Sequence, residues 1–225
     1  STLDNTTSRI RNVRMITHSP EVVEMLQSFD IPVMIEYSSY EQHPLGKVEW
    51  VKFFGALTGK EAEAEEAFAE QTEILEEVES GEKTGKTIAF FYVTSNGLIQ
   101  VRQSTDYIPK LIELAGGRYI FEDLEDSGSG RSTLNMQVED FYAGAKDADI
   151  LIYNSSIDGG VTTLDELIGK CNILKDFKAV QEGQVYCTTN DMYQQSMAIG
   201  YLLQDMHTVL TDDDTAKLRY LFLLQ

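Results

Sequence analysis

Apolar residues follow two different periods along the chain. Thr87–Val93 is a continuous apolar run, typical of a strand that is buried on both faces of a sheet. Ile150–Tyr153 and Val185–Cys187 indicate two more strands, and the second of these is expected to be the final strand of the chain. Apolar residues at helical spacing between Ile199 and Leu210 predict a well-formed helix. From residue 84 onward, strands and helices alternate, which predicts a layered α/β lobe around a mostly parallel central sheet.

Shorter signals complete this part of the chain. Ser104 is expected to cap a helix that ends before Gly116-Gly117, and Tyr119–Phe121 reads as a short strand. Residues 126–132 read as a loop rich in glycine and serine. A last helix is expected over Thr215–Leu223.

The first third of the chain shows a different arrangement. Val13–Ile16 and Ile31–Tyr37 indicate strands, with a helix between them that begins at Ser19-Pro20. A long helical stretch follows over Leu45–Glu79, with a bend near Gly55–Gly59. This predicts one strand–helix–strand unit followed by a long helix.

Charge narrows the classes of partner. The chain has 225 residues, with 18 Lys and Arg against 37 Asp and Glu, so its formal charge is −19. A surface this acidic repels nucleic-acid phosphates and anionic lipid headgroups, so no nucleic-acid partner is expected. His18, His43 and His207 are far apart in the sequence and predict no metal site. We find no catalytic constellation, and predict no enzyme and no resident cofactor. Cys171 and Cys187 are either one disulfide or two buried thiols.

Three stretches of sequence, in this order, carry a resemblance to a known family. They read EQHPLGKVEWVKFFGALTG from Glu41, DYIPKLIELAGGRYIFED from Asp106, and VEDFYAGAKDADILIYNSSIDGG from Val138 followed by FKAVQEGQVYCTTNDMYQQ. Together they resemble the solute-binding proteins of ABC importers that capture ferric siderophores, haem or cobalamin.

The resemblance implies two α/β lobes joined by a rigid helix, with a ligand cleft between them. It divides the chain into a remnant of the N-terminal lobe at 1–43, a linker helix at 44–82 and the C-terminal α/β lobe at 83–225. Much of the first lobe is then missing from this sequence. A partial lobe exposes sheet edge and apolar surface, so we expect this form to pair as a dimer.

The candidate ligand-binding residues lie at the strand ends that would face the other lobe. They are Tyr40 on the first lobe and Tyr92, Asn96, Arg102, Met136, Tyr153 and Tyr193 on the second. Arg102 suits an anionic chelate because a guanidinium pairs bidentately with carboxylate oxygens, and its alternative is a surface arginine beside Asp or Glu. Core packing is the alternative for Tyr92, Tyr153 and Met136, and local packing for Tyr193.

The resemblance also implies a function, a partner and a location. The chain would deliver its chelate to a membrane permease, docking through acidic residues, with Asp158 as the candidate in this chain. It would lie outside the cell, lipid-anchored in a Gram-positive bacterium or periplasmic. The rival interpretations are an enzyme of the chelatase or nitrogenase-like α/β type, and a surface domain without a small ligand.

Overall fold

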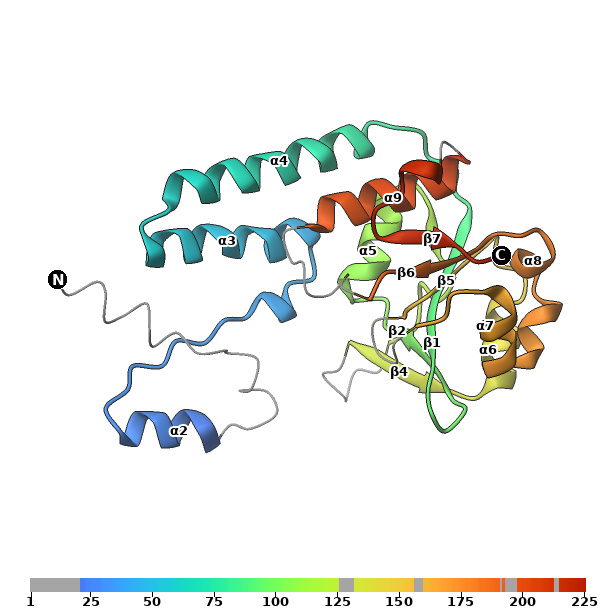
Figure 1. Cartoon of the computed structure of the whole chain (residues 1–225), viewed down its shortest axis with the longest axis horizontal. Coiled ribbons are helices and arrows are strands. Elements are labelled where there is room, and N and C mark those ends of the chain that lie inside the picture. The colour runs from blue at the N-terminus through green and yellow to red at the C-terminus, as the bar shows by residue number, and fades with distance from the viewer. Residues whose placement is uncertain (1–20, 126–131, 156–159, 191, 193–197, 213–214) are drawn as a thin grey trace.

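Strand β1 (Thr87–Val93) is the centre of the fold (Figure 1). The computed structural model describes residues 21–125, 132–155, 160–190, 192, 198–212 and 215–225. Six of the seven strands described in it follow the order β4-β2-β1-β5-β6-β7, and the short β3 also pairs with β1. β1, β5 and β6 are parallel, as are β1 and β3, whereas β2, β4 and β7 join antiparallel. The predicted α/β class is confirmed, and the sheet is mixed: parallel in its middle and antiparallel toward its edges.

Two layers of helices cover the sheet. One face packs against α4 (Glu61–Glu79), α5 (Tyr107–Leu114) and α9 (Ile199–Thr211). The other face packs against α6 (Val138–Ala145), α7 (Leu164–Lys170) and α8 (Lys178–Gln181). The remaining strands of the sheet are β2 (Ile99–Arg102), β3 (Arg118–Tyr119), β4 (Thr133–Met136), β5 (Ile150–Tyr153), β6 (Val185–Thr188) and β7 (Leu221–Leu223). Short 3-10 turns lie at Ser38–Tyr40 (η2), Asn172–Asp176 (η3) and Thr215–Lys217 (η6).

The long helix expected over Leu45–Glu79 is two helices. α3 (Pro44–Thr58) ends at Gly59, which has a left-handed φ of 69°, and α4 begins two residues later and runs back along α3 (Figure 1). The hairpin closes tightly because Gly55 has no side chain: a Cβ there would lie 2.5 Å from that of Ala64. A left-handed glycine ends a helix at little steric cost, which is why the chain turns here instead of bending.

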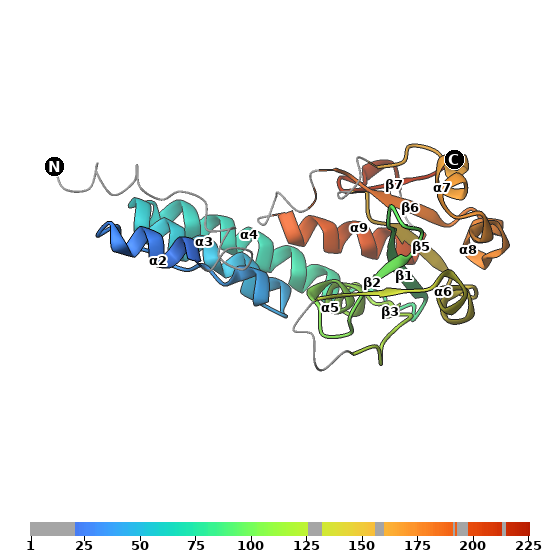
Figure 2. The same ribbon diagram turned by 90° about the horizontal axis from the view of Figure 1, so that it is seen from below.

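α4 is joined to the lobe through α9, which lies beside it (Figure 2). The N-cap of α9, Ala198, has no side chain that could accept a hydrogen bond from the first turn. The buried amide of Gln71 on α4 instead accepts the N–H of Gly200 at 2.8 Å. One helix thus supplies the cap that its neighbour lacks.

Three other expectations for secondary structure need correction. Residues 31–37, expected as a strand, have no regular structure, since within the described residues no strand lies beside them to pair. Residues 215–223, expected as a helix, form η6 and then β7, which pairs antiparallel with β6, so Val185–Thr188 is not the last strand. The helix expected from Ser104 begins at Tyr107, capped by Asp106.

α2 (Glu21–Ser28) is present but buries none of its side chains. The strand expected at Val13–Ile16 lies outside the described residues.

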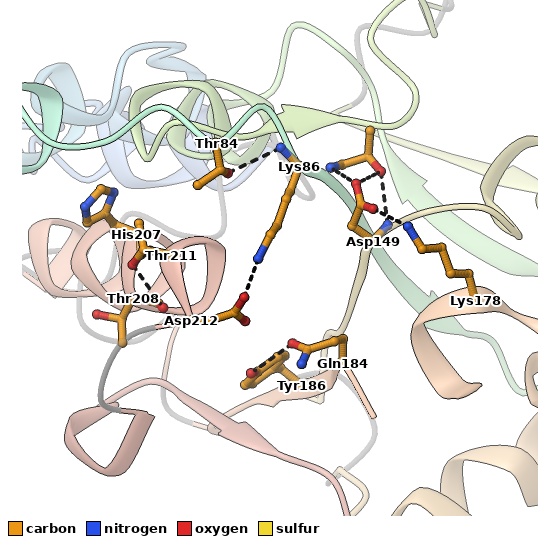
Figure 3. Close-up of polar contacts among 11 residues, drawn as sticks. Thr84, Lys86, Asp149, Lys178, Gln184, Tyr186, His207, Thr208, Thr211 and Asp212 are labelled. Atoms are coloured by element: carbon orange, nitrogen blue, oxygen red, sulfur yellow. Dashed lines mark hydrogen bonds and ion pairs between the residues drawn. The ribbon is translucent and has the colours of Figure 1, made fainter. Parts of the chain in front are cut away.

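A carboxylate secures the amino ends of β1 and β5 (Figure 3). Asp149 Oδ2 accepts hydrogen bonds from the Thr87 N–H at 2.7 Å and from its hydroxyl at 2.8 Å, while Oδ1 accepts from Lys178 Nζ at 2.6 Å. Desolvation alone would raise the pKa of Asp149, but the bonds from Lys178 and Thr87 outweigh it, so that its pKa lies below the ordinary value. Lys86 and Asp212 form a second ion pair nearby, at 2.6 Å.

We predict that Asp149→Asn lowers the free energy of unfolding by about 1 kcal/mol near neutral pH, because the charged bond to Lys178 is lost. A carboxylate whose pKa falls on folding stabilises the protein when the pH lies above the ordinary pKa of 3.8. That stabilisation is lost as the pH falls through the lowered pKa of the folded state. Urea unfolding followed by circular dichroism should therefore show the difference between the variant and the wild type closing at low pH. The control is Asp147→Asn, at an exposed ion pair with Lys146. A difference that persists unchanged in acid would contradict the assignment.

Candidate functional site

The carboxyl ends of β1, β5 and β6 meet at one edge of the sheet, because the three strands run parallel. Ligands of α/β sheets bind outside this edge. A hollow lies there, lined by Phe90, Phe91, Tyr92, Gln100, Val101, Arg102, Thr133 and Asn154. Its lining combines aromatic rings with amide, hydroxyl and guanidinium groups drawn from β1, β2, β4 and the end of β5. Phe90, Phe91, Val101 and Asn154 are almost fully buried, so a ligand at the hollow would meet mainly the partly exposed Tyr92, Gln100, Arg102 and Thr133.

Arg102 is the cation of the hollow and ends strand β2. Its Nη1 lies 3.6 Å from Asp106 Oδ2, and the two side chains are only 12% and 6% exposed. The guanidinium carbon lies 5.8 Å from the centre of the Phe90 ring. An aromatic floor and a nearby carboxylate thus hold the guanidinium at the edge of the hollow.

Asp106 has a second role as the N-cap of α5. Its Oδ1 accepts the Ile108 N–H at 3.0 Å, which satisfies a backbone donor of the first turn. Burial raises the pKa of Asp106, and the neighbouring Arg102 opposes that rise. The carboxylate is therefore held between helix and arginine, where each limits its movement.

Lys47 on α3 brings the preceding segment to this cluster. Its Nζ donates to the Ser38 carbonyl at 2.9 Å and lies 4.5 Å from the centre of the Tyr107 ring. Burial lowers the pKa of Lys47, and the negative charge of Asp106 opposes the change. Lys47 thus connects residues 36–47 with the start of α5 beside the hollow.

A buried polar cluster follows β5 and β6 at the same edge. Ser155 N donates to Thr188 Oγ1 at 3.0 Å, and the Ser155 hydroxyl contacts the Thr188 carbonyl and Asn190 Oδ1. Gly160, with a φ of 88°, passes close by: a Cβ there would lie 3.1 Å from Asn190 Oδ1. These bonds hold the ends of β5 and β6 together.

The structure brings together two of the predicted binding residues, Tyr92 and Arg102, in the lining of the hollow. Tyr153 is fully buried, with its ring 5.5 Å from that of Phe91, which places it in the core. Met136 ends β4 opposite Ile99 and packs partly buried against the same core cluster.

The other predicted residues are more distant or outside the described part. Asn96 is exposed in the turn between β1 and β2, where its side chain accepts from the Thr94 hydroxyl at 2.6 Å. Tyr40 is exposed at the end of η2, beside Tyr37, whose ring centre is 5.9 Å away. Tyr193 and Asp158 lie outside the described residues.

Sequence reasoning missed Asp106, Lys47, Thr133, Asn154 and Ser155. Asn154 and Ser155 directly follow a buried strand, so the strand-end rule that selected Tyr153 could have found them. Lys47 and Asp106 are 59 positions apart, and no local pattern links them. Thr133 belongs to β4, a four-residue strand that the sequence did not predict.

Comparison with known proteins identifies the family. Residues 18–192 match the family model of the periplasmic binding proteins, and that range holds the hollow, the Arg102–Asp106 pair and the buried polar cluster. The chain belongs to this family. No helix in the described part of this periplasmic binding protein has the length and apolar character needed to span a membrane.

Curated relatives of this periplasmic binding protein come from Methanocaldococcus jannaschii. An uncharacterised lipoprotein is 29% identical over 194 residues, which cover 84% of this chain and 45% of the relative. A second uncharacterised lipoprotein is 26% identical over 178 residues, covering 76% of this chain and 44% of the relative. The chain thus spans less than half the length of these two relatives.

Solved structures share the fold at low identity. The haem-binding protein RhuT of Roseiflexus sp. RS-1 superposes with a TM-score of 0.69 at 18% identity, covering 86% of this chain and 72% of that one. An ABC transporter substrate-binding protein of Listeria monocytogenes gives 0.65 at 19%, covering 88% and 74%. IsdE of S. aureus, solved with haem, gives 0.64 at 15%, covering 88% and 75%.

The sequence left two alternatives for the cysteines. Cys171 and Cys187 are both buried and free, so they are two thiols and not a disulfide. Within the described residues, no three His, Cys, Asp or Glu side chains gather in a way that could hold a metal ion.

We predict that Asp106→Ala lowers the free energy of unfolding by about 1 kcal/mol because α5 loses its N-cap, whereas Asp106→Asn keeps it. Burial raises the pKa of Asp106, so the wild type loses stability as the pH rises from the ordinary value of 3.8 through the raised one. Asp106→Asn should remove that pH dependence. Chemical unfolding of the three proteins across this range provides the measurement. Equal losses in the two variants would show that Asp106 does not act as a cap.

Proposed function

We propose that this protein is the extracellular solute-binding component of an ABC importer, which captures a metal chelate and delivers it to a membrane permease. The chelate is a ferric siderophore, haem or cobalamin. The observation that carries the proposal is the match of residues 18–192 to the periplasmic binding proteins, together with Tyr92 and Arg102 in the lining of the hollow at the carboxyl edge of the central strands. Solved proteins of this fold include haem-binding proteins and a Fe3+-hydroxamate transport protein of Saccharomonospora viridis.

The chemistry of such a protein is recognition. The partly exposed Tyr92 ring offers aromatic surface to the ring system of a chelate, while Arg102 offers hydrogen bonds that orient it. The Arg102 guanidinium suits carboxylate or catecholate oxygens, since its parallel N–H groups pair with two acceptors. No bond is made or broken, so the proposal includes no catalysis and no resident cofactor. The competing proposal, a chelatase or nitrogenase-like enzyme, requires turnover of the bound chelate.

The proposed location is outside the cytoplasmic membrane, where the permease is reached. Two of the curated relatives are described as lipoproteins, which supports a lipid-anchored form. A Gram-positive source stays a prediction from the sequence. Asp158 stays the candidate for docking to the permease, and exchange to asparagine in a transport assay is the direct test of it.

Titration with chelates tests the function. We expect saturable binding of at least one of haem, a ferric trihydroxamate, a ferric tricatecholate and cobalamin. The binding is measured by the quenching of Trp50 fluorescence. This tryptophan is well placed as a reporter, since it lies on α3 and its Nε1 donates to Glu41 at 3.2 Å, one turn from Lys47. The absorption spectrum of the chelate should stay that of an intact complex.

Arg102→Ala should weaken the binding of the tightest chelate by roughly 10- to 100-fold, because charge-assisted hydrogen bonds are lost. Arg118→Ala is the matched control, at an exposed arginine on β3. If none of the chelates binds, the proposal is wrong and the interpretation as a surface domain without a small ligand is favoured. Release or insertion of the metal by the protein would favour the enzyme.

We also propose that this chain forms a dimer. The large apolar side chains that stand exposed in the described residues all fall between positions 25 and 54, and they are Met25, Phe29, Met34, Tyr37, Tyr40 and Phe54. An apolar surface of this kind marks a contact with protein. Light scattering is expected to give twice the chain mass of 25.3 kDa, and Phe29→Ser to shift the mass toward the monomer. A monomer at all concentrations tested would contradict the pairing.

A further inference from the structure

One edge of β1 is shared by two strands. β5 pairs with β1 over Ile88–Phe91, and β3 also pairs at Ile88, so β3 must lie on the opposite edge from β5. β2 occupies that same edge further along, and its register with β1 ends at the pair Phe91 and Val101. β3 and β2 therefore follow each other along one edge of β1. Arg102, the last residue of β2, lies just beyond the part of β2 that pairs with β1.

The side chain of Tyr119, the last residue of β3, reaches into this junction. Its hydroxyl accepts the Arg102 N–H at 3.0 Å and donates to the Arg102 carbonyl at 2.8 Å. A strand residue in an antiparallel ladder exchanges the same two bonds with its partner across the sheet. The phenol thus takes the place of a backbone neighbour, and both polar groups of Arg102 are satisfied.

The phenol is well held for this role. Tyr119 is 5% exposed, and its ring packs edge-on against Phe121 with centres 5.9 Å apart. Burial raises the pKa of Tyr119, which keeps the hydroxyl neutral and able both to donate and to accept. Ring and hydroxyl together leave the start of the Arg102 side chain little freedom.

The same residue carries the guanidinium of the hollow. Its backbone is held by Tyr119, its charge lies beside Asp106, and its side chain passes over the Phe90 ring. An arginine gains most from bidentate pairing when its orientation is set before the ligand arrives. If the end of β2 were displaced, the Arg102 guanidinium would move relative to Tyr92 and Asn154, which also line the hollow.

We propose that Tyr119 is a positioning residue for Arg102: on the β1 side of β2, its buried hydroxyl takes the place of a strand partner and sets the direction of the guanidinium that meets the chelate. The inference rests on the proposed function for its consequence in binding, but the contact itself can be tested on ligand-free protein. Tyr119 does not touch the chelate.

The first experiment uses no ligand. In the wild-type protein, the Arg102 amide is expected to exchange slowly with solvent although it ends a strand. The Arg102 Nε–H resonance, assigned by its loss in Arg102→Lys, should shift and broaden in Tyr119→Phe. Tyr201→Phe is the matched control: it also removes one hydroxyl, which bonds Glu70 on the outer side of α4 and α9. A fast-exchanging Arg102 amide, or an Arg102 signal that is the same in Tyr119→Phe and wild type, overturns the inference.

The second experiment measures binding of the panel chelate that the wild type holds most tightly. Tyr119→Phe should weaken its binding by roughly 3- to 10-fold, as expected for lost hydrogen bonds. In an Arg102→Ala background the same exchange should change binding by less than about twofold, since Tyr119 acts through Arg102. An equal loss in both backgrounds overturns the positioning role. If the wild type binds none of the chelates, the proposed function fails, and the ligand-free experiment still decides the role of Tyr119.

Discussion

The pairing of β1 on both of its edges is the constraint on which the rest of the structure depends. β1 has β5 along one edge and β2 with β3 along the other, and nearly all of its side chains are buried. Because this strand is placed by neighbours on every side, its carboxyl end is a stable reference point. Each group of the candidate site is positioned relative to it: Tyr92 belongs to it, Arg102 lies at the junction on one edge, and Asn154 donates its N–H to Phe91 on the other.

The fold could be predicted wherever burial leaves a periodic signal. The run Thr87–Val93 and the stripe of α9 are read correctly because a core imposes its period on the sequence. β7 could not be predicted, because the apolar residues from Leu218 to Leu223 fit a helix equally well. Strand pairing decides the matter: Tyr220 and Leu221 donate their N–H groups to Asp205 of α9, and Leu221 pairs with Thr188. Such contacts are invisible to local periodicity.

The candidate site shows the same division. Tyr92 follows from the rule that ligands meet the carboxyl ends of parallel strands, whereas Arg102, on the antiparallel β2, is a candidate because its charge suits an anionic chelate; the structure places both in the hollow. Asn96 obeys the same rule in sequence but not in space, since the β1–β2 turn carries it away from β5. Lys47, Asp106 and Tyr119 depend on tertiary contacts between separate elements. Their residue types are ordinary, and only their neighbours give them a role.

These contacts also link the hollow to the helices that lead into the lobe. Lys47 ties α3 and the Ser38 carbonyl to Tyr107 at the start of α5, and Gln71 ties α4 to the start of α9. The first is the contact of a flexible lysine side chain with an aromatic ring, whereas the second is a buried hydrogen bond from Gly200 N–H to Gln71 Oε1, which leaves no room for a side chain on Gly200. Loosening the first costs less than breaking the second, because solvent can replace a lysine contact near the surface but not a buried cap. The α4–α9 contact is therefore the rigid part of the connection.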